Sequence, residues 1–295
     1  MVSMRLDKYL AQQYPDISRS ALQQYIKAGT VTVNGQPVTR PSYEVTDGDS
    51  VDFAQPKQPD ITTELNHFAQ KCVLYQDDNV IVVNKPAGML VHAKGGIAHE
   101  FTVADYVRDQ FNPDERATNV GNNRLGIVHR LDRATSGVMI CARSLATASM
   151  LSRQFAERKA HKVYLAVVEC PPLEPVAQIN LPIARNLSRP ATFRVDAKGK
   201  VAITDYQVLH VNDGGTALLE LRPHTGRTHQ LRVHLAHIGC PIVGDPVYGK
   251  GNVSGQRLML HAWQLEITIP GVDDGDNERR IFIAEPPQEF GYNGN

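Results

Sequence analysis

The first part of the chain has apolar residues at helical spacing. Residues 5–14 place apolar side chains on one side of a short helix, and a second helix follows Ser18 or Ser20, either of which can cap it. Gly29 stands where a helix often ends, because glycine readily adopts the left-handed conformation beyond the last turn. The pattern predicts two short helices.

A hairpin pattern follows these helices. TVTV at 30–33 and QPVT at 36–39 are separated by Asn34-Gly35, a pair that favours a tight two-residue turn. A further short strand is expected over 50–53. Two helices and a small sheet therefore form a module of their own.

From about residue 70 the pattern is that of a larger domain. Short apolar or alternating runs predict strands, and longer periodic runs predict helices. The strands are expected at 79–84, 138–142, 163–169, 216–222, 257–261 and 264–269, and the helices at 145–158 and 228–238. Because strands outnumber helices without regular β-α alternation, we predict an α+β fold with a mixed, largely antiparallel sheet.

A change in composition separates the two regions. Residues 54–66 contain two prolines and few large apolar side chains, which is typical of a linker that is ordered only in part. We place the small domain at 1–60, the linker at 61–72 and the larger domain at 73–290. With 295 residues, 42% of them hydrophobic, the chain can form one large core and a small module.

Composition also narrows the cellular setting. No apolar run approaches the roughly 20 residues that span a membrane, and the N-terminus lacks the apolar segment of a secretory signal. The four cysteines are far apart and form no C-x-x-C pair. We therefore expect a cytoplasmic protein without a membrane partner, a disulfide framework or a cysteine-bound zinc.

The net charge is zero, but the charges are unevenly distributed. Residues 124–164 carry eight Lys and Arg against two acidic residues, and residues 222–234 carry three Arg and no acidic residue. Residues 266–289 carry seven acidic residues against two Arg. The basic stretches suit phosphate binding, although a solvated helix face would give similar counts.

The stretch HRLDRATSG at 129–137 places Asp132 between Arg130 and Arg133. The two guanidiniums favour the charged form of the carboxylate, and an anion in a basic setting suits nucleophilic attack on a nucleotide. The alternatives are a surface salt bridge and a carboxylate that caps a turn.

Four histidines lie in these stretches, namely His129, His224, His229 and His234. The last three are five residues apart, which rotates them around a helix, whereas zinc ligands must converge on one point. We therefore expect no bound metal and interpret these histidines as buried polar partners or phosphate donors, with a histidine-dependent metal hydrolase as the alternative.

Two segments resemble known families. Residues 4–53 resemble a ribosomal-protein-S4-like RNA-binding domain, in part through Ser18-Arg19-Ser20 and Val33-Asn34-Gly35. Residues 74–270 resemble a pseudouridine synthase of the RluA/RluD type through several ordered blocks. These blocks include Asn84-Lys85-Pro86-Ala87-Gly88, the HRLDRATSG loop, Lys162-Val163-Tyr164-Leu165-Ala166, residues 224–234, Gly244-Asp245 and Leu260-His261-Ala262.

The resemblance implies an isomerase that converts uridine in RNA to pseudouridine without a cofactor. Asp132 matches the catalytic aspartate, and attack on the sugar or on the uracil ring both remain open. Arg227 matches the basic residue that pairs with this aspartate, or else it is a phosphate clamp or a surface ion pair. Tyr164 matches the active-site tyrosine, or else it packs in the core.

Contacts with RNA are implied as well. Arg130 either fills the place of an everted uridine or contacts a phosphate, and Arg133 and His129 are further candidates for RNA binding. In the small module, Arg19 and Lys27 are expected to contact phosphates, with ordinary solvated charges as the alternative.

The combination of the two segments resembles synthases that act on large-subunit (23S) ribosomal RNA. Transfer RNA is the alternative substrate, and a non-catalytic RNA-binding protein of ribosome assembly is the alternative function. We expect the protein to be a monomer.

Overall fold

The computed structural model describes residues 3–15, 17, 19–54, 60–93, 100–119, 122, 124–249, 255–272 and 275–292. The chain forms two compact units, Met1–His67 with His92–Leu125 and Phe68–Val91 with Gly126–Asn295, which are described separately. Within the described ranges, no helix has the length and apolar character needed to cross a membrane.

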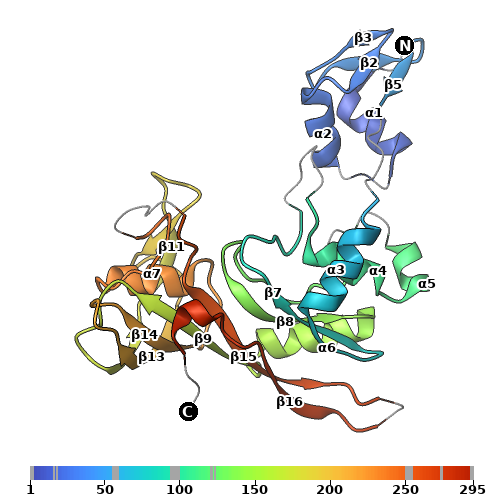
Figure 1. Ribbon diagram of the computed structural model, residues 1–295. Coiled ribbons are helices and arrows are strands. Elements are labelled where there is room, and N and C mark those ends of the chain that lie inside the picture. The colour runs from blue at the N-terminus through green and yellow to red at the C-terminus, as the bar shows by residue number, and fades with distance from the viewer. Residues whose placement is uncertain are drawn as a thin grey trace. The chain divides into compact units, whose positions relative to one another are not determined.

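The N-terminal module of the first unit has two short helices and two small sheets (Figure 1). Its elements are β1 (Ser3–Arg5), α1 (Leu6–Gln13), α2 (Arg19–Lys27), β2 (Val31–Val33), β3 (Gln36–Pro37), β4 (Glu44–Thr46) and β5 (Val51–Phe53). The apolar stripes of the helices are buried, as at Leu6 and Leu22. Asn34 and Gly35 have φ of 51° and 76°, which the predicted two-residue turn requires. The helices and hairpin are confirmed, whereas the pairing of β1 with β4 in a second sheet was not foreseen.

A helix, α3 (Thr62–Cys72), begins within residues 54–66, which we expected to be ordered only in part. Leu65, Phe68 and Cys72 recur at helical spacing, and the last two are buried. The expectation of partial order is wrong for the residues of this helix, because a few well-spaced apolar residues suffice for a buried face, whereas the linker assignment of 61–72 stays a prediction. The domain boundaries at 60 and 73 stay a prediction, and residues 55–59 lie outside the described part.

Two more helices of the first unit, α4 (Val103–Asp109) and α5 (Pro113–Thr118), were left unassigned by the sequence pattern. The Thr102 hydroxyl accepts the backbone N–H of Asp105, and the Asp105 carboxylate accepts the backbone N–H of Thr102. This reciprocal pair caps the start of α4.

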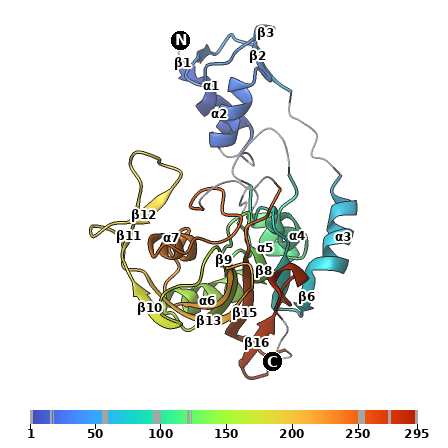
Figure 2. The ribbon, with the colours of Figure 1, turned by 60° about the vertical axis from the view of Figure 1, so that its left-hand side comes forward.

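The second unit is built on one nine-stranded sheet (Figure 2). Its strand order is β10-β13-β14-β9-β15-β8-β7-β6, with β16 paired to β15. The strands are β6 (Val73–Gln76), β7 (Val80–Lys85), β8 (Ser136–Ala142), β9 (His161–Val168), β10 (Val176–Asn180), β13 (Ile203–Val211), β14 (Ala217–Pro223), β15 (Leu260–Ile269) and β16 (Glu278–Ile283). Among the described strands of this sheet, β8 and β15 run parallel and the other neighbours are antiparallel. The predicted mixed, largely antiparallel sheet is confirmed.

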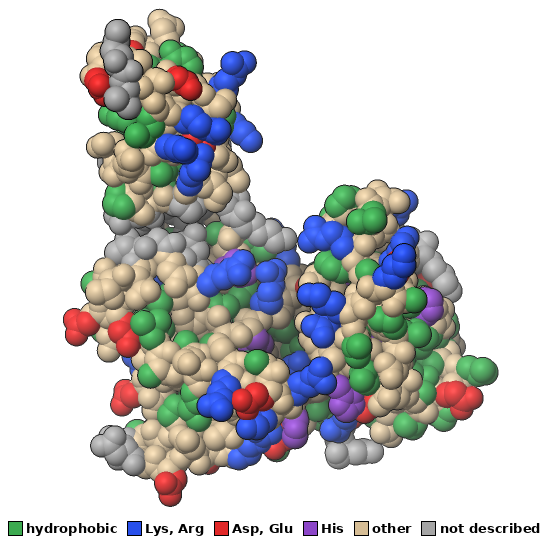
Figure 3. Space-filling view, turned by 180° about the vertical axis from the view of Figure 1, so that it is seen from behind, with side chains coloured by type: hydrophobic (Ala, Val, Ile, Leu, Met, Phe, Trp, Pro, Cys, Tyr) green, Lys and Arg blue, Asp and Glu red, His purple; other side chains and the backbone are tan. Residues whose placement is uncertain are grey.

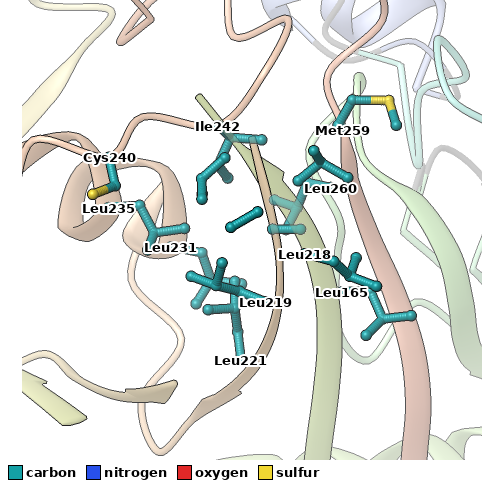
Figure 4. Close-up of a cluster of buried hydrophobic side chains, with 14 of the residues drawn as sticks. Leu165, Leu218, Leu219, Leu221, Leu231, Leu235, Cys240, Ile242, Met259 and Leu260 are labelled. Carbon is teal, nitrogen blue, oxygen red and sulfur yellow. The ribbon is translucent and has the colours of Figure 1, made fainter. Parts of the chain in front are cut away.

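Helices α6 (Leu145–Ala156) and α7 (Gln230–His237) accompany this sheet. Leu231 and Leu235 of α7 point toward the sheet, where Leu219 and Leu221 of β14 lie beside them (Figure 4). This apolar contact holds α7 against the sheet. The structure also has a hairpin of β11 (Ile183–Arg185) and β12 (Phe193–Val195), and a short helix η1 (Gln288–Phe290), none of which was predicted.

Candidate active site

The second unit contains a cavity of about 540 Å³. Its walls come from the HRLDRATSG loop, the end of α6, β9 and the segment between β14 and α7. In Figure 3, Lys, Arg and His side chains lie along the hollow of the larger part of the molecule. The charged residues described in the cavity wall are Asp132 and five cations, Arg130, Arg158, Lys162, Arg227 and Arg232. The cavity is therefore suited to a polyanion.

Lys85, at the end of β7, supports the loop that carries Asp132. Its fully buried ammonium donates hydrogen bonds to the carbonyl oxygens of Pro86, Met89 and Arg133 at 2.9, 3.0 and 3.1 Å. Burial lowers the pKa of Lys85 to about 7, while the charge of Asp132 acts in the opposite direction. The sequence blocks at 84–88 and 129–137 thus meet at one ammonium.

Gly137 explains why this loop ends in glycine. Its φ is 117°, and a Cβ at this position would overlap the backbone of Ala262 on the parallel strand β15. Only glycine allows β8 to approach β15 so closely directly after the loop.

The Asp132 carboxylate is one-quarter exposed and lies at the end of a chain of ionic contacts. Its Oδ2 is 3.3 Å from Nη1 of Arg232, a residue of α7 whose side chain is only 6% exposed. The same guanidinium binds the fully buried Asp245 through two parallel bonds of 2.8 Å. Asp245 also accepts the backbone N–H groups of Val247 and Tyr248. A fork held in this way has a fixed orientation, so Arg232 positions Asp132 as well as neutralising it.

The predicted pairing of Arg227 with Asp132 is wrong. Arg227 lines the same cavity, but its Nε donates to the carbonyl of Val201 at 3.0 Å. Arg227 precedes α7, whereas Arg232 is held inside the helix between two apolar residues, and that position brings it to the carboxylate. A charge in such a place needs a buried partner, and this signal could have singled out Arg232.

Tyr164 lies on β9 and lines the cavity, as predicted for an active-site tyrosine. Its side chain is only partly buried by the described structure, so it is not simply a core residue. Burial and the nearby negative charge of Asp132 raise the pKa of its phenol. Tyr164 therefore keeps its proton at neutral pH.

His129 lines the cavity and also bonds to the backbone of strand β8. Its Nε2 accepts the backbone N–H of Ile140 at 3.0 Å, and its ring stacks on Phe155 at 4.4 Å between centroids. Burial lowers the pKa of His129 to about 3, and Lys162 adds to this shift. A neutral imidazole contributes no charge to a phosphate contact but can still donate a hydrogen bond, so the RNA-binding role of His129 stays a prediction.

His129 should make the protein less stable in acid. Since its pKa is about 3 when folded and 6.5 otherwise, the unfolded chain binds the proton first as the pH falls below about 6.5. The free energy of unfolding should then decrease by up to ~1.4 kcal/mol per pH unit, until the pH nears the folded pKa. Urea unfolding between about pH 5 and 6.5 should give a shallower slope for His129→Gln than for wild type. Equal slopes would contradict a neutral His129.

The histidines of residues 224–234 each have a different partner. His224 pairs with Asp205 at 2.6 Å, and the Nδ1 of His229 lies 2.9 Å from the hydroxyl of Tyr248. His234 is buried, with Nε2 at 2.9 Å from a backbone carbonyl. No group of three or more possible metal ligands occurs among the described residues.

His229 also approaches the site, although no catalytic role was predicted for it from the sequence. Its Nε2 is 3.7 Å from Oδ2 of Asp132, and it has a left-handed φ of 56° at the start of α7. A non-glycine residue in this conformation is uncommon and is found preferentially at functional sites. Its position is set by the turn before α7, which the apolar pattern alone did not reveal.

The remaining predicted RNA contacts lie on the surfaces of their own units. Arg130 and Arg133 are exposed, and Arg130 lines the cavity. In the first unit, Lys27 is exposed in the last turn of α2, and Arg19 is about half exposed. Arg19 also binds the fully buried Asp7 at 2.8 Å, so its guanidinium is anchored rather than freely solvated.

A basic cavity around one carboxylate, in a chain that also carries a small module with exposed cations, indicates an enzyme that acts on nucleic acid. The comparisons agree with this class. A model of the RNA pseudouridylate synthase family matches residues 79–237, and a model of the S4 domain matches residues 4–51. This chain belongs to the RNA pseudouridylate synthase family, and it is therefore an isomerase that acts on RNA.

Relatives match over nearly the whole chain. An uncharacterized RNA pseudouridine synthase of Aquifex aeolicus is 36% identical over 97% of this chain and 91% of its own length. A protein of Borreliella burgdorferi named ribosomal large subunit pseudouridine synthase D is 36% identical over 98% of this chain and 88% of its own. The solved structure of human RNA pseudouridylate synthase domain containing 4 has a TM-score of 0.58 and 27% identity, and it covers 78% of this chain and 93% of that chain.

Proposed function

We propose that this enzyme isomerises uridines of large-subunit ribosomal RNA to pseudouridine, with Asp132 as its catalytic group. The observation that supports this proposal most strongly is the position of Asp132. Among the described residues that line the cavity, Asp132 is the acidic one beside five cations, and Arg232 holds its carboxylate in place. The names of relatives such as those of Borreliella burgdorferi and Xylella fastidiosa support the ribosomal substrate.

The reaction rearranges one nucleotide without adding or removing atoms overall. The bond between C1′ of ribose and N1 of uracil breaks, C1′ joins C5, the proton on C5 leaves and N1 gains a proton. Asp132 can attack C1′ or the uracil ring, and both routes use an ionised carboxylate. Tyr164, with its proton retained, can stack on the base and place its hydroxyl near the moving proton.

The cations around Asp132 are assigned to the RNA strand. A uridine must leave its stack to reach the cavity, which costs a few kcal/mol. Arg130 is assigned to the vacated place or to a neighbouring phosphate, and Arg133 to a further phosphate. Arg19 and Lys27 are assigned to the backbone of a structured region bound by the S4 domain. The monomeric state and the cytoplasmic location stay predictions.

The test uses large-subunit ribosomal RNA transcribed with tritium at C5 of uridine. Purified protein should release tritium until a small number of sites per RNA is converted, and a chelator should not prevent this. Binding with no release from any RNA would favour a non-catalytic assembly protein. Release from transfer RNA but not from ribosomal RNA would contradict the proposed substrate.

A further inference from the structure

One wall of the cavity is a row of alternate residues that runs away from Asp132. Arg158, Ala160, Lys162 and Tyr164 all line the cavity. Alternate residues of a strand point to the same face, as Lys162 and Tyr164 of β9 do, whereas Arg158 joins this wall from the turn after α6. The row begins at an exposed guanidinium, passes a partly buried ammonium and ends at the phenol beside Asp132.

Lys162 is a cation that has no acidic partner among the described residues. It is partly buried, and among the described residues its ammonium makes no ion pair or side-chain hydrogen bond. Burial lowers its pKa. A Cβ placed on Gly226 would lie 3.8 Å from its Nζ, so a residue without a side chain leaves the ammonium open to the cavity from that direction. A partly desolvated charge of this kind is stabilised when a ligand of opposite charge binds it.

Arg158 has an unusual backbone for an arginine. It follows the end of α6 with a left-handed φ of 59°, and the N–H of Lys159 closes the helix end on the carbonyl of Gln154 at 2.8 Å. Glycine is the usual residue at such a helix end. Arginine at this position is a strained choice, and within the described part its guanidinium has no acidic partner.

The neighbouring cations behave differently. Arg153 and Lys159 both bind the carboxylate of Glu157, at 2.8 and 2.7 Å, and neither lines the cavity. The end of α6 therefore has paired cations outside the cavity and unpaired cations inside it. This separation is what an anion site requires.

We propose that Lys162 and Arg158 form a binding subsite for a backbone phosphate of the RNA strand, next to the nucleotide that reaches Asp132. This proposal rests on the proposed function, because that function places the target nucleotide at Asp132. The ammonium and the guanidinium each donate hydrogen bonds to the phosphate oxygens. These bonds hold the RNA strand in position while Tyr164 and Asp132 contact the target nucleotide.

The first test measures binding of a fluorescent 15-nucleotide oligouridylate over a range of salt concentrations. Lys162→Met should bind about tenfold more weakly, and the slope of log affinity against log salt should fall by about 0.7, the value for one phosphate of a single strand. Lys159→Met removes the same charge three residues away and outside the cavity, so its affinity and slope should stay near those of wild type. No binding by wild type at low salt, or equal effects of the two variants, would overturn the proposal.

The second test uses Arg158→Gly, which removes the guanidinium and relieves the backbone. This variant should bind the oligouridylate about tenfold more weakly, yet unfold at the same or a higher urea concentration than wild type. A purely structural Arg158 would instead leave binding unchanged, and that result would exclude it from the subsite.

Free phosphate is the other source of the same chemistry. Lys162→Met could weaken the binding of millimolar inorganic phosphate but leave oligouridylate binding unchanged. In that case the site binds a small anion, and its assignment to the RNA strand is wrong. These readouts do not depend on isomerisation. A protein that binds through Lys162 but releases no tritium would keep the subsite and refute the proposed function.

Discussion

Asp132→Asn should lower kcat for tritium release by about 10⁴-fold or more, the scale seen when a central catalytic carboxylate is lost. The amide keeps the shape of the side chain but is a poor nucleophile and base, so the barrier should rise by about 5.5 kcal/mol. RNA affinity should be unchanged or tighter, because a negative charge leaves a cavity that binds phosphates. Single-turnover release and a separate binding measurement distinguish the two effects.

Stability provides the check on this variant. Arg232 keeps both of its bonds to Asp245 when Asp132 changes, so the free energy of unfolding should shift by less than about 1 kcal/mol. Asp196→Asn, which removes a carboxylate outside the cavity, should leave kcat near that of wild type. If Asp132→Asn released tritium at the wild-type rate, Asp132 would have no catalytic role.

Arg232→Lys should lower kcat by about 10²-fold, whereas Arg227→Gln should change kcat by less than about tenfold and act mainly on KM. Lysine keeps the charge of Arg232 but cannot bind Asp245 through a fork while reaching Asp132, and a misplacement of about 1 Å can cost 10²-fold. Arg227 has no contact with Asp132, so its loss weakens RNA binding without moving the carboxylate. Steady-state kinetics on the same RNA separate kcat from KM.

The comparison of these two arginines needs a control for folding. Arg232 and Asp245 form a buried pair, so Arg232→Lys is expected to lose some stability, and kcat must be taken per folded molecule from urea unfolding. The structure would be wrong about the partner of Asp132 if Arg227→Gln lowered kcat as much as Arg232→Lys does.

Much of the fold follows from local patterns. The two helices and the hairpin of the S4 domain, strands β7, β8, β9 and β14, and helices α6 and α7 were predicted because their apolar spacing is regular. Strands such as β10 and β13 were missed, since their exposed residues weaken the alternation. Helix α3 was missed because composition was given more weight than spacing.

The candidate site was predicted only in part. Asp132 and Tyr164 were recognised through motifs and do share a cavity, and Arg130 and Arg227 line it as well. Arg232 and Asp245 stood inside motifs without an assigned role, and Arg158 and Lys162 were not singled out. The role of each of these four residues depends on whether a side chain from another element pairs with it.

The amino-acid sequence by itself determined the α+β class, the S4 module, the loop that carries Asp132 and the membership of a family of RNA isomerases. These properties depend on residue types and spacings that are local in the chain. Only the tertiary structure decided which arginine reaches Asp132, that His129 is a neutral partner of the backbone, and which cations remain unpaired. The ion pair of Arg232 with Asp132 depends on a distance of a few ångströms between residues that are 100 positions apart, and only the packing of α7 against the sheet sets that distance.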